Sequence, residues 1–331
     1  MLDDMGTWRR THYTADIRSE EQGREVILAG WIHDMRVVGG ISFIILRDRE
    51  GMVQITVKKK DVGDDKYKRL ITLPRESVIM VKGFVNFSPK VHAGLEIIIS
   101  EYKVLSIAKK PLPLGIADDV HADLDTRLNA RFLDVRKPEV MALFKIRATM
   151  LSSIRKTLES MGFIEVHTPK IVATATEGGT ALFPVKYFEM DAFLNQSPQL
   201  YKQILMATGM DRVYEIGPAF RAEEHDTTKH LNEFTSVDIE MAFSDHNDAM
   251  NVLERVIKDA VRAVNNEMAE ELEVLGVGLP DIEYNFPRVS YDECVDFVNS
   301  HGANVRWGED FDAEAMKILG KEYDCFYFIV D

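Results

Sequence analysis

Over the first hundred residues, apolar side chains alternate with polar ones in short runs that turn residues separate. These runs are rich in β-branched and aromatic residues, which favours strands, and Gly39-Gly40 and Ser88-Pro89 break them. A polar stretch of helical composition, 61–70, lies between the third run and the fourth. Five strands with a helix after the third is the order of an OB-fold β-barrel, a frequent binder of oligonucleotides. The runs cover 25–36, 41–47, 52–57, 77–87 and 95–107.

After residue 107 the pattern changes to helical spacing. We expect 1–107 to form the barrel domain and 108–130, which contains Pro111 and Pro113, to form a linker or hinge. Residues 131–331 are expected to form a larger α+β domain, an antiparallel sheet flanked by helices. Its predicted helices cover 138–161 and 245–268, the second with Leu253 on its buried side, and its predicted strands cover 163–171, 213–220 and 233–243.

Composition and charge narrow the class of protein. The 331 residues carry a net charge of -14, but residues 1–106 hold 17 Lys and Arg against 15 Asp and Glu, so the barrel is the better candidate for binding a polyanion. Two cysteines, Cys294 and Cys325, are too few for a disulfide framework, which is typical of a cytoplasmic protein. No apolar run is long enough for a membrane helix, and the polar start does not suit a signal peptide.

The residues that best suit a binding or catalytic site lie in the segment 220–240, FRAEEHDTTKHLNEFTSVDIE. Residues two apart in a strand share a face, so Arg221 and Glu223 can point into one cavity, and so can Phe234, Asp238 and Glu240. A guanidinium beside a carboxylate and an aromatic ring suits a nucleotide, because the charge pairs with phosphate and the ring stacks on a base. An exposed hairpin with surface ion pairs would show the same residues.

The order of these features resembles the class II aminoacyl-tRNA synthetases. The second motif of that family, an arginine followed by a loop and an antiparallel strand, corresponds to the segment from Phe220 to Phe234. Its first motif, a long helix leading to a strand that proline closes, corresponds to 138–169. This resemblance implies a homodimer with Pro169 at the interface.

Two further stretches resemble the aspartyl-tRNA synthetases of the archaeal and eukaryotic type. ATATEGGTALFP, 173–184, is similar to the mobile loop that closes over substrate, and QSPQLYKQ, 196–203, is similar to the aspartate-binding signature. A cation must meet the substrate's side-chain carboxylate in a closed pocket, so Lys202 favours aspartate over asparagine. Lys202 as an exposed helix lysine is the alternative. The aspartate-binding residues that the resemblance implies are Glu177, Ser197, Gln199, Lys202, Arg221 and Asp238.

The resemblance implies a two-step ligase reaction that forms a carbon–oxygen bond. ATP and Mg²⁺ activate L-aspartate to aspartyl-adenylate, and a terminal hydroxyl of tRNA(Asp) then takes the aspartyl group. Arg221 and Glu223 would be the catalytic residues. The Mg²⁺ ligands are expected beyond Asp331, so we predict no metal ligands within these residues, and the spacing of His167 and His225 does not suit zinc. The ATP-binding residues would be Arg221, Glu223, Lys229, His230, Leu231 and Phe234.

In the barrel, Arg36, Phe43 and Gln54 match the positions at which this family reads the anticodon. An unstacked base needs an aromatic platform and a donor–acceptor group such as an amide. Phe43 as part of the barrel core is the alternative. His33 and His92 fall near positions that separate enzymes strict for tRNA(Asp) from those that also charge tRNA(Asn), and histidine at both favours the non-discriminating form.

The third motif of the family is missing before Asp331. We therefore expect a C-terminally truncated chain with little activity of its own, which ends in an apolar strand, 325–331, without a pairing partner. Three other functions stay open. They are an asparaginyl-tRNA synthetase, which Lys202 opposes; an asparagine-forming relative that acts on the free amino acid, which the barrel opposes; and a nucleic-acid-binding or regulatory protein derived from a synthetase, without ligase activity.

Overall fold

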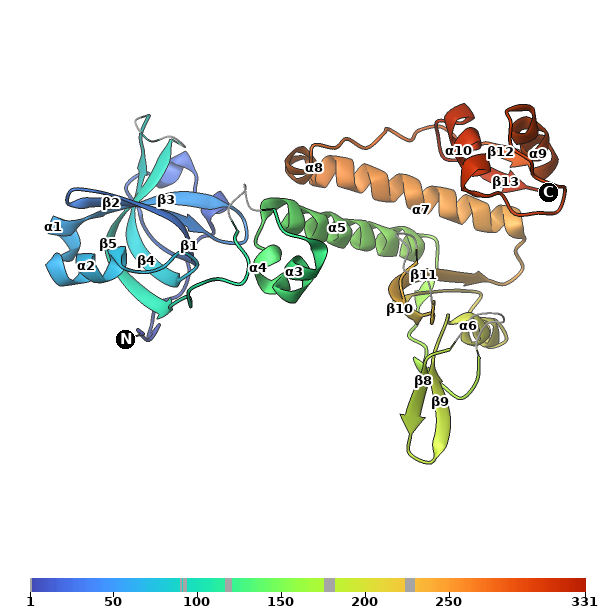
Figure 1. The fold of residues 1–331 in the computed structure, drawn as a ribbon, viewed down its shortest axis with the longest axis horizontal. Coiled ribbons are helices and arrows are strands. Elements are labelled where there is room, and N and C mark those ends of the chain that lie inside the picture. Colours follow the sequence, from blue (N-terminus) through green and yellow to red (C-terminus); the bar gives the residue numbers. More distant parts are fainter. Residues whose placement is uncertain (1, 90, 92–93, 117–120, 176–181, 224–229) are drawn as a thin grey trace. The chain divides into compact units, whose positions relative to one another are not determined.

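The computed structural model describes residues 2–89, 91, 94–116, 121–175, 182–223 and 230–331 (Figure 1). Two compact units, Met1–Leu133 and Asp134–Asp331, divide the chain. This division groups the segment 108–130 with the barrel. No helix among the described residues is long and apolar enough to cross a bilayer.

Five strands close a barrel in the order β1-β2-β3-β5-β4. β3 and β5 pair in parallel and the other neighbours are antiparallel. Each strand alternates, so that Leu28, Ile44 and Ile55 point inward and are fully buried. The OB-fold prediction is confirmed, with strand ends within two residues of those expected. The strands are β1 Glu25–Val38, β2 Ile41–Arg47, β3 Met52–Lys58, β4 Val78–Phe87 and β5 Leu95–Ser106.

The helical stretch after β3 closes the barrel at one end, where Tyr67 and Leu70 join its core. The single helix expected over 61–70 is instead two, α1 Lys59–Val62 and α2 Asp64–Ile71. Gly63 separates them with a φ of 86°, a conformation that ends a helix and that glycine adopts without strain. Two 3-10 turns, η1 Thr14–Asp16 and η2 Ser19–Glu21, precede β1.

The described part of the expected linker is packed. Leu114 and Ile116 are buried in one cluster with Ala130 and Leu133. Ala130 lies between two short helices that the sequence pattern did not reveal, and Leu133 lies on the second of them. Helices of one or two turns are too short to show a 3.6-residue period. They are α3 Leu124–Asn129 and α4 Arg131–Asp134.

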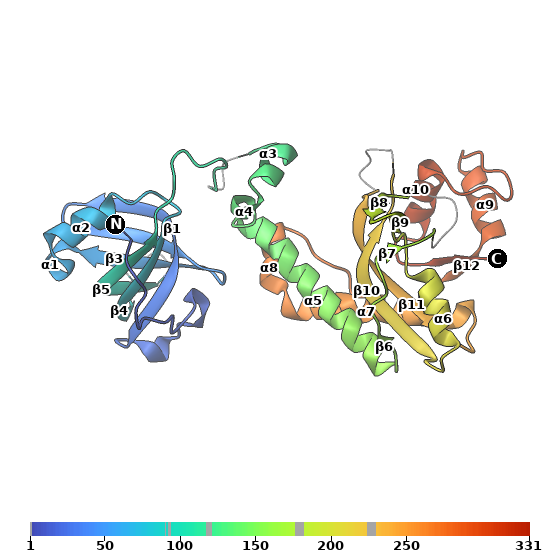
Figure 2. The same cartoon turned by 90° about the horizontal axis from the view of Figure 1, so that it is seen from below.

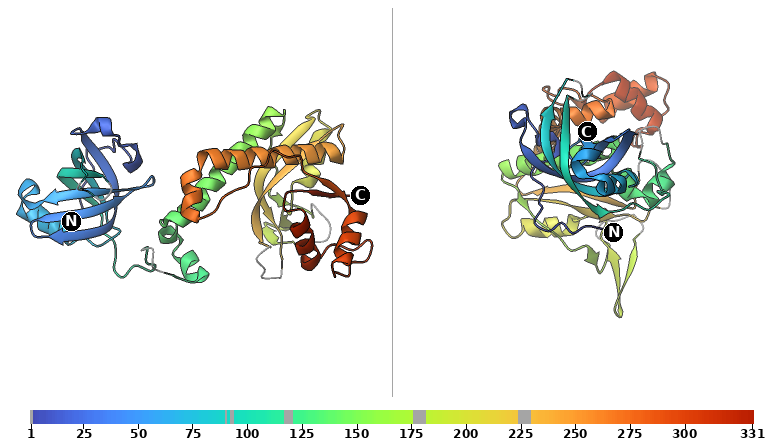
Figure 3. Two further views of the ribbon diagram at one scale, coloured as in Figure 1. Left: turned by 90° about the horizontal axis from the view of Figure 1, so that it is seen from above. Right: turned by 90° about the vertical axis from the view of Figure 1, so that its left-hand side faces the viewer.

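In the second unit, two long helices cover one face of a small sheet (Figures 2 and 3). The sheet has the order β11-β10-β6, in which β10 and β11 are antiparallel and β6 lies parallel to β10. Tyr214 and Ile216 of β10 pack against Leu158 and Val256 of the helices. The strands are β6 Ile164–Glu165, β10 Arg212–Phe220 and β11 Glu233–Met241, and the helices are α5 Pro138–Ser160 and α7 His246–Glu267, which α8 Ala269–Leu275 follows.

Two predictions for this unit are wrong. The strand expected over 163–171 contains only β6 and, at its far end, the start of β7 Ile171–Val172. Between them the Thr168 N–H donates to the Glu215 side chain and not to a neighbouring strand, and Pro169 has no N–H for a ladder. β7 belongs to a separate sheet, β7-β9-β8, with β8 Pro184–Tyr187 and β9 Met190–Leu194. Leu253 is 47% exposed, since the buried residues of α7 recur every four positions from Val252 to Val264.

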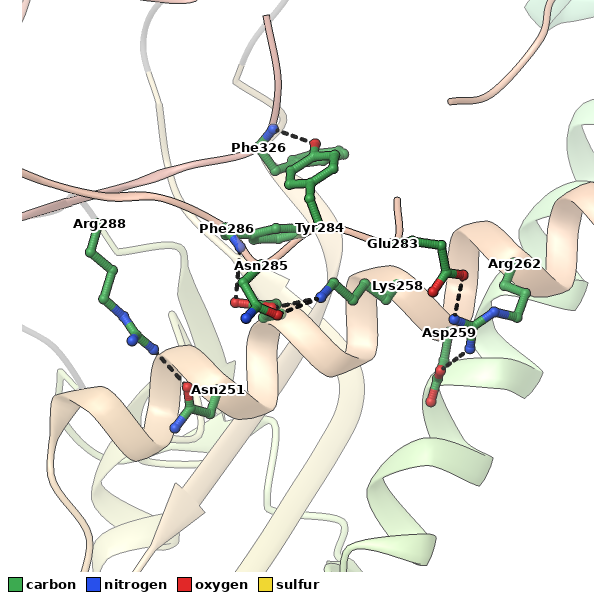
Figure 4. Close-up of polar contacts among 11 residues, drawn as sticks. Asn251, Lys258, Asp259, Arg262, Glu283, Tyr284, Asn285, Phe286, Arg288 and Phe326 are labelled. Carbon is green, nitrogen blue, oxygen red and sulfur yellow. Dashed lines mark hydrogen bonds and ion pairs between the residues drawn. The ribbon is translucent and has the colours of Figure 1, made fainter. Parts of the chain in front are cut away.

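The C-terminal strand also differs from expectation, because it has a partner. β13 Phe328–Val330 pairs in parallel with β12 Arg288–Ser290, and between them lie α9 Tyr291–Ser300 and α10 Ala313–Glu322. Side chains of α7 hold the segment that leads into β12 (Figure 4). Arg262 pairs with Glu283 at 2.8 Å, and Asn251 accepts a hydrogen bond from Arg288 at 2.6 Å.

Candidate active site and candidate nucleic-acid interface

The hairpin of β10 and β11 presents a second face, opposite the helices. Tyr214 and Ile216 point toward α5 and α7, so their neighbours in the strand point the other way. Across the hairpin Glu215 is directly opposite Asp238, Gly217 is opposite Ser236, and Ala219 is opposite Phe234. Phe234, Asp238 and Glu240 therefore share one face, as their alternation predicts.

Lys202 meets this face from α6 Gln199–Met206 and is only 4% exposed, so the alternative of an exposed helix lysine is wrong. Its Nζ lies 3.2 Å from Asp238 Oδ1 and 3.8 Å from Glu240 Oε2, and donates to the Ile239 carbonyl at 3.2 Å. Gln199 Nε2 donates to Glu240 at 3.4 Å. One buried ammonium thus lies between two carboxylates.

Ser197 and Gln199 lie at the start of the same helix. Ser197 is 5% exposed, and its Oγ accepts a hydrogen bond from the Gln199 N–H at 3.2 Å. The structure therefore brings together four of the six predicted aspartate-binding residues. Of the others, Arg221 lies farther along the hairpin, and Glu177 lies outside the described residues.

At the other end of the hairpin, Arg221 lies over the ring of Phe234, with 5.5 Å from its Cζ to the ring centroid. Its N–H donates to the Asn232 carbonyl at 3.0 Å, which continues the ladder beyond β10. The Glu223 N–H turns back to the Arg221 carbonyl at 2.8 Å. A cation and an aromatic face are therefore held together at this end. His230 and Leu231, both exposed, precede β11, and Lys229 lies outside the described residues.

Small residues lie on the open face of the hairpin, between the Lys202 cluster at one end and the Arg221–Phe234 pair at the other. Asp238 and Phe234 are four residues apart on β11, or roughly 13 Å at about 3.3 Å per residue. Gly217 lies between them on the neighbouring strand, where an added Cβ would approach Glu215 Oε1 to 3.2 Å. Gly217 thus leaves room on this face for the Glu215 carboxylate, and Gly217 and its cross-strand partner Ser236 are the residues between the two ends.

Glu215 anchors the segment after β6, a role that the sequence motifs do not predict. This carboxylate is 1% exposed and accepts from the Thr168 N–H at 3.0 Å and the Thr168 hydroxyl at 2.7 Å, and it pairs with Lys170 Nζ at 2.8 Å. A glutamate in the middle of the apolar run VYEIGPAF was the available signal. Pro169, the predicted interface residue, is exposed between Thr168 and Lys170. Next to Glu215, burial and the contact with Glu165 raise the pKa of Tyr214.

In the barrel, the outer face of β1, β2 and β3 forms a shallow cavity of 540 Å³. Phe43 lines it and is not part of the barrel core, so that alternative is wrong. Arg36 is directly opposite Phe43 in the β1–β2 register, and Gln54 lies on the next strand. Gln54 Nε2 donates to Glu96 at 3.2 Å, and Glu96 also accepts from Asn86 at 2.8 Å. The structure therefore brings the three predicted anticodon residues together and adds Glu96.

His33 lies beside this cavity and contacts Arg47, with 2.8 Å between His33 Nδ1 and the guanidinium. Its neighbour Asp34 lines the cavity. Partial burial works to raise the pKa of Asp34, but the Met35 N–H bond and the charge of Arg75 outweigh it and hold that pKa below its usual value. His92 lies outside the described residues.

No group of three or more His, Cys, Asp and Glu side chains among the described residues is arranged to hold a metal ion. His167 is exposed, and His225 lies outside the described residues.

The chain combines an OB-fold barrel with a sheet that has one open face. This face carries an arginine over an aromatic ring and a lysine between two carboxylates. Together these features define a class of protein that loads amino acids onto tRNA. Residues 123–331 match the family of class II tRNA synthetases (D, K and N), and residues 26–105 match the OB-fold nucleic acid binding domain. The chain belongs to the class II tRNA synthetases.

Several relatives have a narrower description. The chain is 55% identical over 324 residues to Aspartate--tRNA(Asp/Asn) ligase of Methanocaldococcus jannaschii, with 98% of this chain and 74% of that protein covered. It is 52% identical over 313 residues to Aspartate--tRNA(Asp) ligase of Thermococcus kodakarensis, with 94% and 72% covered. Asparaginyl-tRNA synthetase of Pyrococcus horikoshii, complexed with asparaginyl-adenylate, superposes with a TM-score of 0.88 at 33% identity, and the match covers 96% of this chain and 73% of that one.

Proposed function

We propose that this chain belongs to an aspartate–tRNA ligase, which activates L-aspartate with ATP and transfers it to tRNA(Asp). The observation that carries the proposal is the buried ammonium of Lys202 between Asp238 and Glu240. The curated relatives named above are described as aspartate–tRNA ligases. We also propose that it acts in the cytoplasm, as a homodimer with Pro169 at the interface.

The charges on the open face are complementary to aspartate. The substrate's side-chain carboxylate would pair with Lys202, and its α-ammonium would pair with the surplus negative charge of Asp238 and Glu240. Its α-carboxylate would then point along the open face toward Arg221. Asparagine has no side-chain charge for Lys202, which would leave a buried ammonium without that partner. This argues against the alternative of an asparaginyl enzyme.

The chemistry needs no protein nucleophile. An oxygen of the aspartate α-carboxylate would attack the α-phosphorus of ATP and expel pyrophosphate, and a terminal hydroxyl of the tRNA would then attack the adenylate carbonyl and release AMP. Arg221 would neutralise the α-phosphate, and Phe234 would stack on adenine. Glu223, His230 and Leu231 would contact ATP from the turn that follows Arg221.

Mg²⁺ would accompany the ATP phosphates and neutralise their charge. The residues that the structure describes contain no cluster of three candidate ligands for it. We therefore assign none of them to the metal, and no step above depends on it.

Exchange of pyrophosphate into ATP tests the activation step. The product of the complete gene should catalyse this exchange when aspartate is present. Asparagine at the same concentration should support it at least about a hundredfold less, because a site built for a charged group leaves its own buried charge unpaired when that group is missing. Equal rates with the two amino acids would contradict the assignment to aspartate.

In the barrel, Arg36, Phe43 and Gln54 would hold the anticodon. Phe43→Ala should weaken binding of an RNA hairpin with the aspartate anticodon by about 1–3 kcal/mol, the value of one base stacked on an aromatic ring. Fluorescence anisotropy at fixed salt measures this change. Phe84→Ala is the matched control, since Phe84 is 46% exposed on another strand of the barrel and does not line the cavity. Equal loss in both variants would contradict the role of Phe43.

The range of tRNAs is a further part of the proposal. Histidine at positions 33 and 92 favours an enzyme that also charges tRNA(Asn), and the relatives named above include descriptions with and without tRNA(Asn). Charging of purified tRNA(Asn) at a rate within about tenfold of that for tRNA(Asp) would support this wider range. Tenfold is the discrimination that about one hydrogen bond provides. Charging of tRNA(Asp) alone would remove it.

A further inference from the structure

Trp307 is a large side chain on the surface of the second unit. It lies in the loop between α9 and α10 and is 77% exposed (Figure 1). The ring of Trp8, in the barrel unit, shows what an indole attracts, because Lys82 and Lys103 lie over it at 5.2 Å and 5.1 Å from its centroid. No Lys or Arg of the described residues lies over Trp307 in this way. Its ring is thus available to a cation that these residues do not supply.

Side chains on both sides of the tryptophan fasten the loop that carries it. The Tyr291 hydroxyl accepts a hydrogen bond from the Gly308 N–H at 2.9 Å and donates one to the Glu309 carbonyl at 2.7 Å. The Asn299 amide bonds both backbone groups of Val305, at 2.9 Å and 2.8 Å. The indole is therefore held in position before any partner arrives, which lowers the entropy cost of binding.

The Trp307 corner consists of Trp307, Tyr291 and Asp292. The two rings stand at 79° to each other, with 6.3 Å between their centroids. The indole Nε1–H donates to Asp292 Oδ1 at 2.7 Å. The second carboxylate oxygen, Oδ2, has no hydrogen bond or ion pair with any residue that the structure describes. Two aromatic faces nearly at a right angle, beside a carboxylate, suit an organic cation.

The charge around the corner is strongly negative. Of residues 291–314, seven are Asp or Glu and one, Arg306, is basic. Such a surface repels the phosphates of a nucleic acid and attracts a cationic partner. We propose that the Trp307 corner is a docking site for a basic segment of a partner protein, which places a lysine or arginine side chain against the indole and beside Asp292. This inference is independent of the proposed ligase function.

The first test asks which kind of molecule reaches the ring. The product of the complete gene is labelled with 5-fluorotryptophan, and the fluorine signal of Trp307 is assigned by its loss in Trp307→Phe. A short peptide of alternating glycine and lysine should shift this signal saturably and leave that of Trp8 unchanged. The same peptide with glutamate in place of lysine, and a short single-stranded RNA, should not shift it. A Trp307 signal that the RNA shifts, or that the lysine peptide leaves unchanged, would overturn the proposal.

The second test separates the corner from general attraction between opposite charges. The Kd of the fluorescently labelled lysine peptide is measured by anisotropy at fixed salt. Trp307→Leu keeps an apolar side chain but removes the ring, and should raise the Kd about two- to fivefold, the value of one cation–π contact at an exposed site. Asp292→Asn keeps an acceptor for the indole N–H but removes the charge, and should also raise the Kd.

Asp310→Asn is the matched control for the second test. It removes an equal charge from an exposed position in the same loop, outside the corner, and should have a clearly smaller effect than Asp292→Asn. All three substitutions are at exposed positions, so the variants should melt near the wild-type temperature. Equal weakening by Asp292→Asn and Asp310→Asn, or an unchanged Kd in Trp307→Leu, would mean that the peptide is attracted by net charge alone and would overturn the docking site.

Discussion

Replacing Lys202 with methionine is expected to reduce aspartate-dependent ATP–pyrophosphate exchange by about 10²- to 10³-fold. The substitution leaves Asp238 and Glu240 without their shared counter-ion, and loss of one partner of a buried pair costs about 3–5 kcal/mol. It also removes the only cation that we assign to the substrate's side chain. The exchange rate is measured in the product of the complete gene, at saturating ATP and varied aspartate.

Two controls separate the pocket from the fold. Lys202→Arg keeps the positive charge and should retain more activity than Lys202→Met, although the larger head group will not fit the same geometry. Lys186→Met removes a lysine from an exposed position on β8 and should have no effect. A Lys202→Met protein that melts near the wild-type temperature and still activates aspartate normally would disprove the role of Lys202.

Strong periodicity made most of the fold predictable. The five barrel strands, α5, α7 and the β10–β11 hairpin each repeat their apolar residues long enough to determine the type of element. The wrong predictions occur where the local sequence pattern is short or where a single residue determines where an element ends. Gly63 divides a helix, the Glu215 side chain takes the hydrogen bonds of Thr168 where a strand was expected, and β13 pairs with β12, about 40 residues earlier in the chain. No local pattern contains such a pairing.

The candidate site was predictable only in part, for a related reason. Residues that we propose to act directly on the substrates, such as Lys202 and Arg221, stand in recognisable motifs. Residues that hold those motifs in place act through partners far away in the sequence. Glu215 bonds Thr168 across 47 positions, and Glu96 bonds Gln54 across 42. Only the folded register shows that such carboxylates are supports and not surface charges.

Under the proposed function, the open face of the hairpin would allow one sheet to bind both substrates. Alternation along β10 and β11 places the lysine–carboxylate cluster and the arginine–phenylalanine pair on the same side, with small residues between them. The other side packs against α5 and α7, which keeps the strands rigid. A reaction that depends on positioning, with no protein nucleophile, needs such a rigid support.

Replacing Arg221 is expected to lower kcat for adenylate formation by about 10²- to 10³-fold, the loss found when one preorganised donor to a developing charge is removed. In contrast to position 202, lysine should not restore activity at position 221. A guanidinium can donate two parallel hydrogen bonds to phosphate and lie flat over the Phe234 ring, whereas an ammonium is a point charge without that plane. Arg221→Met and Arg221→Lys should therefore be impaired to within about tenfold of each other.

Arg212→Met is the matched control for this prediction. Arg212 lies on the same strand, is exposed, and also lies over a phenylalanine ring, with 5.8 Å from its Cζ to the centroid of Phe163, but it points away from the open face. Its loss removes an equal charge and a similar ring contact, so adenylate formation should be unchanged. Single-turnover measurement of adenylate formation separates this step from product release. If Arg221→Lys keeps the wild-type rate, or if Arg212→Met loses as much as Arg221→Met, the guanidinium at position 221 is not the group that neutralises the phosphate.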